Sequence, residues 1–388
     1  MKLAARMAVL ETESAFEVLA RADVLARQGR SIINLGIGQP DVPTAPHVVE
    51  AAQRALADGH HGYTPATGIL ALREAVAADV SARTGVEIDP DFVLITPGAK
   101  VGLFFAMLAC GEPGVKILYP DPGFPIYASA IRFSGAVPVP YSLDEELEFS
   151  FRADDILARI TPATRLLILN SPGNPTGGMA REEELDALVA GLERAPQVTV
   201  LSDEVYRRIH YGDAPPRSLL SFPSLRERLI LVDGWSKTYA MTGWRIGWSL
   251  WPRAAMEGVT RLAINDHSCV NAATQWAGIA ALQGPQDGVD AMVAAFDRRR
   301  RFLVDALNQV PGWRCATPRG AFYAFPNISE GGLPARAVQD HLLEELGIAT
   351  IAGTSFGAGG EGFLRLSYAA DLTSIEQALD RIHGWLGG

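Results

Sequence analysis

Short runs of apolar residues alternate with amphipathic helical segments through the middle of this 388-residue chain. Most runs are almost continuously apolar, which is typical of strands covered on both faces. Between two of them, the segment 181–193 carries leucine and valine at the spacing i, i+3, i+4, i+7, which predicts a helix with one buried stripe. Strands that alternate with helices are joined by right-handed crossovers into a mostly parallel sheet, so the sequence predicts an α/β fold. The predicted strands are Phe92–Thr96, Val115–Tyr119, Val137–Tyr141, Arg165–Asn170, Val198–Ser202, Leu229–Asp233 and Trp244–Leu250.

The pattern changes near Gln283–Asp290, a stretch rich in glycine, glutamine and aspartate. A long helix follows, and we interpret its arginine run, Arg298–Arg301, as a solvated face. Beyond it, an α+β pattern places short strands at Phe322–Phe325, Ile348–Ile351 and Phe363–Ser367. We therefore expect a large α/β domain over residues 48–285 and a smaller α+β domain that combines residues 1–47 with residues 286–388.

Composition and charge place the chain among ordinary globular proteins. Hydrophobic residues make up 48% and charged residues 20%, which excludes a disordered or fibrous chain. The net charge of −10 argues against a protein that binds duplex DNA, because neutralising phosphates requires a basic face. Three widely spaced cysteines, Cys110, Cys269 and Cys315, predict neither a disulfide framework nor a metal site. No apolar stretch approaches the ~18 residues of a membrane span, and the first residues make a poor signal peptide, so we expect a cytoplasmic protein.

The most informative segment is Asp233–Arg245, in which Lys237 follows directly after a predicted strand. Open α/β sheets bind their ligands at the carboxyl ends of the strands, and small residues around Lys237 leave room for a flat molecule. A lysine amine at this edge can form a Schiff base with an aldehyde when it is held partly deprotonated. By itself the signal is weak, because a lysine at a strand end is more often only solvated.

Three other predicted strands end in polar motifs at the same edge of the sheet, namely Thr96–Lys100, Asn170–Gly177 and Ser202–Tyr206. The first resembles a phosphate cradle, because backbone N–H groups at a helix N-terminus bind anions. The other two also have simpler explanations as a turn and as a helix cap. Together with the lysine, the three motifs supply what pyridoxal phosphate requires: an amine for its aldehyde, a carboxylate for its pyridinium nitrogen, donors for its phenolic oxygen and a cup for its phosphate.

With these motifs, and above all with the run Ser-Lys-Thr-Tyr-Ala-Met-Thr-Gly-Trp-Arg, the chain resembles the class I pyridoxal-phosphate-dependent aminotransferases of fold type I, in the bacterial aspartate aminotransferase-like subgroup. The resemblance extends from about Ser31 to Ala369. It implies a homodimer with shared active sites. It also implies a ping-pong transfer of the amino group of an L-amino acid to a 2-oxo acid, with 2-oxoglutarate or pyruvate as the acceptor.

The resemblance also implies which residues hold the cofactor. Lys237 is implied to be the Schiff-base lysine and the proton shuttle, and Asp203 to pair with the pyridinium nitrogen. Asn174 and Tyr206 are implied to hydrogen-bond the phenolic oxygen, and Asn174 also to contact the substrate. The residues implied to lie around the cofactor phosphate are Gly98, Ala99, Lys100, Ser236 and Arg245. Gly234 departs from relatives that carry a phosphate-binding serine at this position.

Further residues are implied to contact the cofactor ring, the substrate or the neighbouring subunit. Phe124 matches the aromatic side chain that stacks on the cofactor ring, and Gly38 matches a glycine that contacts the substrate. Arg365 matches the arginine that binds the substrate α-carboxylate, a task suited to a guanidinium fork. Tyr63 matches a tyrosine that reaches the cofactor phosphate of the partner subunit. Lys100 has two open roles, because its ammonium either adds charge near the phosphate or binds the distal carboxylate of an acidic substrate.

Some of the same residues are also compatible with other functions. A lyase or racemase that uses pyridoxal phosphate would employ nearly the same residues, because each begins by breaking a bond to the substrate Cα. A non-catalytic regulator on this fold is disfavoured, since the chain has no basic segment for a DNA-binding module. A serine hydrolase would use Ser355, in the Gly-x-Ser-x-Gly run, with Asp371 and His383, but too little chain follows Ser355 to carry an acid and a base to it. The side chain of the amino donor stays open among aspartate, alanine, aromatic and basic amino acids.

Overall fold

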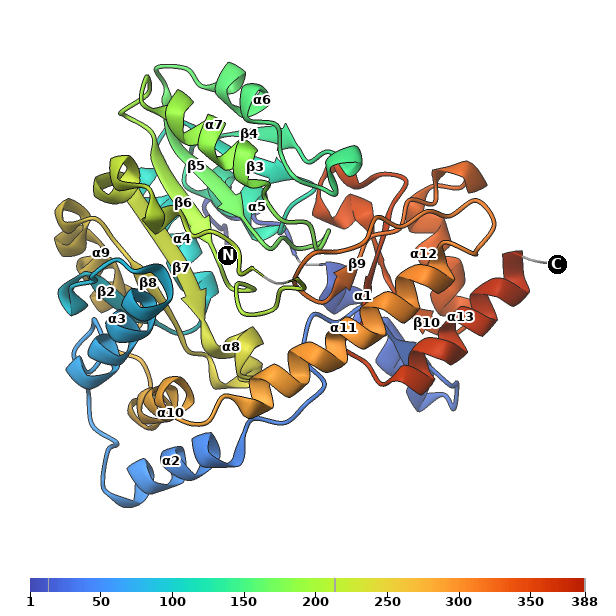
Figure 1. Cartoon of the computed structure of the whole chain (residues 1–388), viewed down its shortest axis with the longest axis horizontal. Helices are drawn as coiled ribbons and strands as arrows, with labels where there is room; N and C mark the ends of the chain where they lie inside the picture. Colours follow the sequence, from blue (N-terminus) through green and yellow to red (C-terminus); the bar gives the residue numbers. More distant parts are fainter. Residues whose placement is uncertain (13, 213, 387–388) are drawn as a thin grey trace.

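The computed structural model describes residues 1–12, 14–212 and 214–386. Its centre is a seven-stranded sheet in the order β2-β8-β7-β6-β5-β3-β4 (Figure 1). β8 runs antiparallel to both of its neighbours, whereas the other neighbouring strands pair in parallel. The predicted α/β fold with a mostly parallel sheet is therefore confirmed. The strands are β2 Val93–Thr96, β3 Lys116–Asp121, β4 Val137–Ser142, β5 Thr164–Asn170, β6 Thr199–Asp203, β7 Leu229–Gly234 and β8 Gly247–Leu250.

The central strands are apolar because helices cover both faces of the sheet. Leu166 and Ile168 of β5 pack in the cluster under one group of helices, whereas Leu167 and Leu169 pack in the cluster under the other. Since side chains alternate between the two faces of a strand, a strand covered on both sides has to be apolar throughout. One face is covered by α4 Ala99–Cys110, α5 Ile126–Phe133 and α9 Arg253–Asp266. The other is covered by α2 Pro46–Ala57, α3 Leu70–Thr84, α6 Ala153–Arg159, α7 Glu182–Leu192 and α10 Ala272–Gln283.

A second, smaller group of elements combines the two ends of the chain. β1 Ile33–Asn34 pairs in parallel with β10 Ile348–Ala349. In a separate antiparallel sheet, β12 Leu364–Ser367 lies between β11 Ile351–Ala352 and β9 Tyr323–Ala324. The long helix α11, Asp287–Leu307, runs from α10 toward this group (Figure 1). The remaining helices of the group are α1 Ser14–Arg27, α12 Ala335–Glu344 and α13 Leu372–Leu386.

The arginine run on α11 differs from the prediction at one position. Arg300 is only 9% exposed, so the interpretation of this run as a solvated face is wrong there. Its guanidinium donates hydrogen bonds to the Pro318 carbonyl oxygen at 2.9 Å and to the Asp297 carboxylate at 2.5 Å. It also lies over the Tyr211 ring, 4.6 Å from the ring centre. A buried guanidinium is tolerated here because it donates hydrogen bonds to these two acceptors and its charge is paired with that of Asp297.

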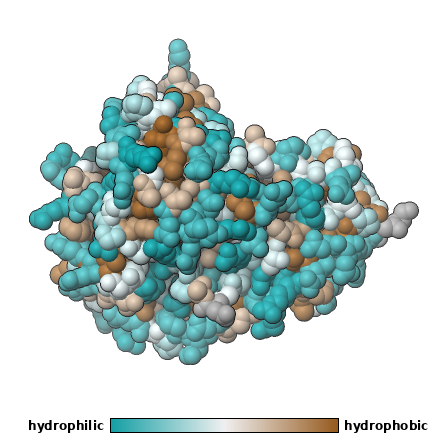
Figure 2. All heavy atoms as spheres, turned by 45° about the horizontal axis from the view of Figure 1, so that its top comes forward, coloured by the Kyte–Doolittle hydropathy of each residue, from teal (hydrophilic) through white to brown (hydrophobic). Residues whose placement is uncertain are grey.

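Figure 2 shows that hydrophilic side chains cover most of one face of the molecule and that apolar ones gather in small areas. Within the described part of the chain, each helix is too short or too polar to cross a bilayer. In the same residues there is also no cluster of three or more histidine, cysteine, aspartate or glutamate side chains that could hold a metal ion.

Candidate active site

A cavity of about 530 Å³ lies at the carboxyl ends of β2, β5, β6 and β7. The ends of parallel strands meet at one edge of a sheet, which is why motifs from distant parts of the sequence come together here. The sequence-predicted residues that line the cavity are Gly38, Ala99, Lys100, Phe124, Asn174, Asp203, Tyr206, Ser236, Lys237, Arg245 and Arg365. Gly98 lies against Arg245 at its edge.

Lys237 lies in the short helix α8, Trp235–Thr238, directly after β7. Its Nζ donates a hydrogen bond to the carbonyl oxygen of Gly38 at 2.6 Å and lies 6.0 Å from the centre of the Phe322 ring. The amine therefore faces the segment that precedes α2 across the cavity. Gly38 has no room for a side chain, because a Cβ there would lie 2.3 Å from the hydroxyl of Tyr323.

Asp203 ends β6 and is 2% exposed. The Tyr127 hydroxyl donates a hydrogen bond of 2.6 Å to its Oδ2, and the Val205 N–H donates one of 3.4 Å to its Oδ1. Burial raises the pKa of Asp203 to about 6, although both hydrogen bonds act in the opposite direction. A cation placed in the cavity beside this carboxylate would stabilise its charged form.

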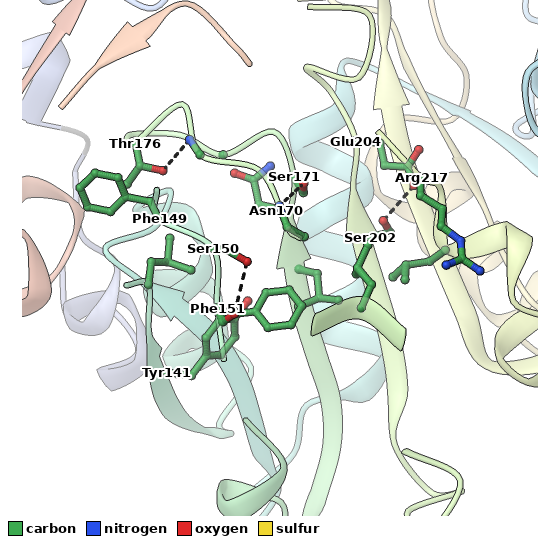
Figure 3. A pocket seen from close by; sticks show the side chains of 17 residues that line it. Tyr141, Phe149, Ser150, Phe151, Asn170, Ser171, Thr176, Ser202, Glu204 and Arg217 are labelled. Carbon is green, nitrogen blue, oxygen red and sulfur yellow. Dashed lines mark hydrogen bonds between the residues drawn. The ribbon is translucent and has the colours of Figure 1, made fainter. Parts of the chain in front are cut away.

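Glu204, the next residue along the chain, is held by other side chains than those that contact Asp203 (Figure 3). Its carboxylate accepts hydrogen bonds from the hydroxyls of Ser202 at 3.0 Å and Ser218 at 2.9 Å, and it pairs with Arg207 at 3.2 Å. It lines a different cavity of about 30 Å³ under the loop that follows β5. Of the two adjacent carboxylates, it is therefore Asp203 that faces the large cavity.

Arg365, on β12, is held in a fixed orientation inside the cavity. Its Nη1 donates a hydrogen bond to Asn174 Oδ1 at 2.9 Å, and its Nη2 donates one to the carbonyl oxygen of Gly36 at 2.6 Å. The guanidinium lies between the rings of Tyr323 and Phe356, 4.5 Å and 4.7 Å from their centres. A planar, pre-oriented guanidinium is well suited to bind a carboxylate through two hydrogen bonds.

The N-terminus of α4 and the side chain of Arg245 form a cradle for an anion. Gly98 has φ +89°, and a Cβ there would lie 2.3 Å from Nη2 of Arg245. A Cβ on Gly247 would lie 2.2 Å from the backbone nitrogen of Ala99, so both glycines are needed for this close approach. The first N–H groups of a helix have no intrahelical partner and attract anions, as does a guanidinium. Nearby, Lys100 Nζ lies 5.2 Å from the centre of the Phe124 ring.

Sequence reasoning missed three contributors to this site. Tyr127, which donates a hydrogen bond to Asp203, lies in α5 only three residues after Phe124, so its nearness to that residue in the sequence could have indicated it. Tyr323 places its hydroxyl 2.8 Å from that of Tyr206, and no local signal indicates this contact. α1 lines the cavity with residues that include Phe16, although it belongs to the N-terminal part of the chain.

Two singled-out motifs lie outside the cavity. Tyr63 is 94% exposed and lines a separate pocket of about 360 Å³, so a single chain does not bring it to the proposed phosphate site. Ser355 lies in a 3₁₀ turn, Gly353–Phe356. Asp371, the acid required by the hydrolase alternative, instead accepts a hydrogen bond of 2.9 Å from the Ser374 N–H at the start of α13. It acts as a helix cap, which removes the support for that alternative.

The sequence matches the family described as aminotransferase class I and II over residues 30–382. It is 36% identical to the aspartate aminotransferase of Geobacillus stearothermophilus over 100% of this chain and 99% of that protein. It is 35% identical to aromatic-amino-acid aminotransferase 2 of Thermococcus litoralis over 92% of each protein. The crystal structure of the aspartate aminotransferase from Rhizobium meliloti superposes with a TM-score of 0.94 at 32% identity, over 99% of this chain and 98% of that one. The chain therefore belongs to the class I and II aminotransferase family.

Proposed function

We propose that this chain is a pyridoxal-phosphate-dependent aminotransferase that moves the amino group of an L-amino acid to a 2-oxo acid by a ping-pong mechanism. The observation that carries the proposal is the convergence of Lys237, Asp203 and Arg365 on one cavity beside an anion cradle. An amine, a buried carboxylate and a pre-oriented guanidinium are the three groups that this chemistry requires of the protein. Family membership supports the reaction class.

The cavity residues fit pyridoxal phosphate by the chemistry of their donors. Glycines at positions 98 and 247 let Arg245 and the start of α4 approach closely enough to form the cradle for the phosphate. The raised pKa of Asp203 identifies a carboxylate that gains from pairing with a protonated ring nitrogen. When bound, the cofactor supplies an aldehyde for the lysine amine and a ring that takes up the electrons released at the substrate Cα.

Each residue near the cofactor has a defined task. Asp203 would keep the proton on the ring nitrogen, and the hydrogen bond from Tyr127 fixes the direction in which its carboxylate faces. Tyr206 and Asn174 would donate hydrogen bonds to the phenolic oxygen of the cofactor. The residues that would hold the phosphate are Gly98, Ala99, Ser236 and Arg245, with Lys100 as a further candidate, and Phe124 would cover one face of the ring.

The substrate is bound and deprotonated by a second set of groups. Arg365 binds the α-carboxylate, and the rings on both sides of its guanidinium keep the fork in the required plane. Lys237 takes the proton from the substrate Cα and later returns one. Its hydrogen bond to the carbonyl oxygen of Gly38 places the amine next to a residue proposed to contact the substrate.

The remaining lining of the cavity accommodates the substrate side chain. It is mostly apolar, with Phe16, Leu19 and Leu103, but Lys100 adds a positive charge. This mixed lining supports both acidic and aromatic amino acids as donors, in agreement with the aspartate and aromatic aminotransferases to which the chain is similar.

We further propose a homodimer in which Tyr63 completes the cavity of the partner subunit. Its exposure and its place in a pocket separate from the cavity of its own chain support this role. The division into residues 48–285 and residues 1–47 with 286–388 is also proposed. Separate apolar clusters around the large sheet and around α11 support it.

A panel of donors tests the proposed function. Protein supplemented with pyridoxal phosphate is incubated with L-aspartate, L-alanine, L-phenylalanine or L-lysine, and with either pyruvate or 2-oxoglutarate. The proposal requires that the acceptor is aminated in the same amount as the donor is converted to a 2-oxo acid. A lyase or a racemase would change the donor without aminating the acceptor. Ser355→Ala is the control variant and should leave the rate unchanged, because Ser355 does not line the cavity.

A further inference from the structure

Tyr323 lies at a point where three residues of the proposed site meet. It is 1% exposed, and its hydroxyl is 2.8 Å from that of Tyr206. The centre of its ring lies 4.5 Å from the guanidinium carbon of Arg365. A Cβ on Gly38 would lie 2.3 Å from its hydroxyl oxygen. One phenol therefore contacts a proposed cofactor ligand, a proposed substrate ligand and the glycine that faces Lys237.

The antiparallel pairing of β9 with β12 explains this position. Tyr323 stands opposite Ser367 in the register, and Arg365 lies two residues before Ser367 on the same strand. Residues two apart on a strand share a face, and long side chains reach their diagonal neighbours on the adjacent strand. The ring of Tyr323 and the guanidinium of Arg365 therefore meet on the side of the sheet that faces the cavity.

The hydrogen bond between the two phenols has a defined direction once Tyr206 binds the cofactor. Each hydroxyl carries one proton, so Tyr206 can donate to a single acceptor. When that acceptor is the phenolic oxygen of the cofactor, Tyr323 has to donate to Tyr206. A hydroxyl that accepts a hydrogen bond becomes a stronger donor, and the effect is larger in a buried site. Burial also holds the pKa of Tyr206 well above its usual value, which keeps the donor proton in place.

We propose that Tyr323 is a positioning residue that acts on the reaction in two ways. Its hydroxyl directs the proton of Tyr206 toward the cofactor, and its ring holds the guanidinium of Arg365 for the substrate carboxylate. This inference rests on the proposed function and extends it to a residue with no direct role in the chemistry.

Two substitutions separate the two effects. Tyr323→Phe removes the hydroxyl and keeps the ring, whereas Tyr323→Leu removes both. Tyr368→Phe is the matched control, because Tyr368 is equally buried and its hydroxyl donates to the Ala321 carbonyl oxygen at 3.3 Å, outside the lining of the cavity. Two readouts are measured on the cofactor-loaded protein: the pKa of the bound chromophore, from absorbance against pH, and the Kd of the unreactive carboxylates succinate and 3-phenylpropionate.

We expect Tyr323→Phe to raise the pKa of the bound chromophore by roughly 0.3 to 1 unit, because a weaker donor stabilises the ionised phenolic oxygen less. Its Kd values should stay within about twofold of wild type, because the ring remains. Tyr323→Leu should show the same shift and also bind both carboxylates about 3- to 10-fold more weakly. The shift should be absent when Tyr323→Phe is introduced into Tyr206→Phe, because the two hydroxyls act as one chain.

The inference is overturned if Tyr323→Phe leaves the chromophore pKa unchanged while Tyr206→Phe moves it. It is also overturned if Tyr368→Phe produces an equal shift, because the effect would then be a general loosening of the core. Wild-type protein that forms no Lys237-dependent chromophore would instead show that the proposed function fails, and the inference with it.

Discussion

Replacing Asp203 by asparagine is expected to stabilise the cofactor-free protein while it impairs the reaction. Asp203 is 2% exposed, and burial raises its pKa from 3.8 to about 6. For an acid, a pKa that is higher in the folded state means that folding favours the protonated form. The stability of the wild type therefore falls as the pH rises from about 4 to beyond 6. Each pKa unit corresponds to about 1.4 kcal/mol, so the buried carboxylate costs about 3 kcal/mol at pH 8.

Asparagine at position 203 has the same shape and stays neutral at every pH. Its amide oxygen can accept the hydrogen bond from the Val205 N–H, and its amide N–H can donate to the Tyr127 hydroxyl, which accepts as readily as it donates. The variant therefore keeps both hydrogen bonds without the cost of a buried charge.

Urea unfolding of the cofactor-free proteins at pH 5 and pH 8 measures the difference. The Asp203→Asn protein should be more stable than wild type by about 3 kcal/mol at pH 8 and by about half as much at pH 5. An equal difference at the two pH values would refute the reasoning, because Asp203 would then not titrate in this interval. Added pyridoxal phosphate should stabilise the wild type more than the variant, since only a carboxylate pairs with the protonated ring nitrogen.

Three further predictions concern other residues of the proposed site. Lys237→Ala should have a Tm within a few degrees of wild type by calorimetry, but it should lose transamination and, by absorbance spectroscopy, the yellow colour of the bound cofactor. Turnover at the wild-type rate would remove Lys237 from the mechanism. Tyr63→Ala chains mixed with Lys237→Ala chains should regain activity in heterodimers, because one cavity then combines an intact Lys237 with Tyr63 from the other chain. No recovery of activity in verified heterodimers would exclude shared sites. Lys100→Ala should lower kcat/KM for aspartate and glutamate by about 5- to 100-fold and barely change it for alanine, if Lys100 binds the distal carboxylate. A uniform loss across donors, with weaker cofactor binding, would assign Lys100 to the phosphate.

Local signals were sufficient to predict the sheet and the residues at its edge. Strands such as β5 and β7 are apolar on both faces, so they stand out in the sequence without knowledge of their neighbours. Parallel strands also place their carboxyl ends together, so motifs that contain Asn174, Asp203 and Lys237 were expected at one site, and all three line one cavity.

Features that depend on long-range pairing or on unusual backbone were not predicted. The strand expected at Trp244–Leu250 begins only at Gly247, because Arg245 adopts φ +54° and breaks the extended conformation. The strand expected at Ile348–Ile351 is divided into β10 and β11, which pair with different partners. The contact between Tyr323 and Arg365 follows from the register of β9 and β12, and neither segment carries a local signal for it.

A single half-reaction tests the central claim most directly. Protein loaded with pyridoxal phosphate and freed of excess cofactor is mixed with its best L-amino acid donor in the absence of any acceptor, and the 2-oxo acid formed is counted per active site. We predict about one 2-oxo acid per site, loss of the yellow absorbance, and return of that absorbance when 2-oxoglutarate or pyruvate is added and becomes aminated. Continued formation of 2-oxo acid without an acceptor, or none at all, would contradict the proposal that this protein is an aminotransferase.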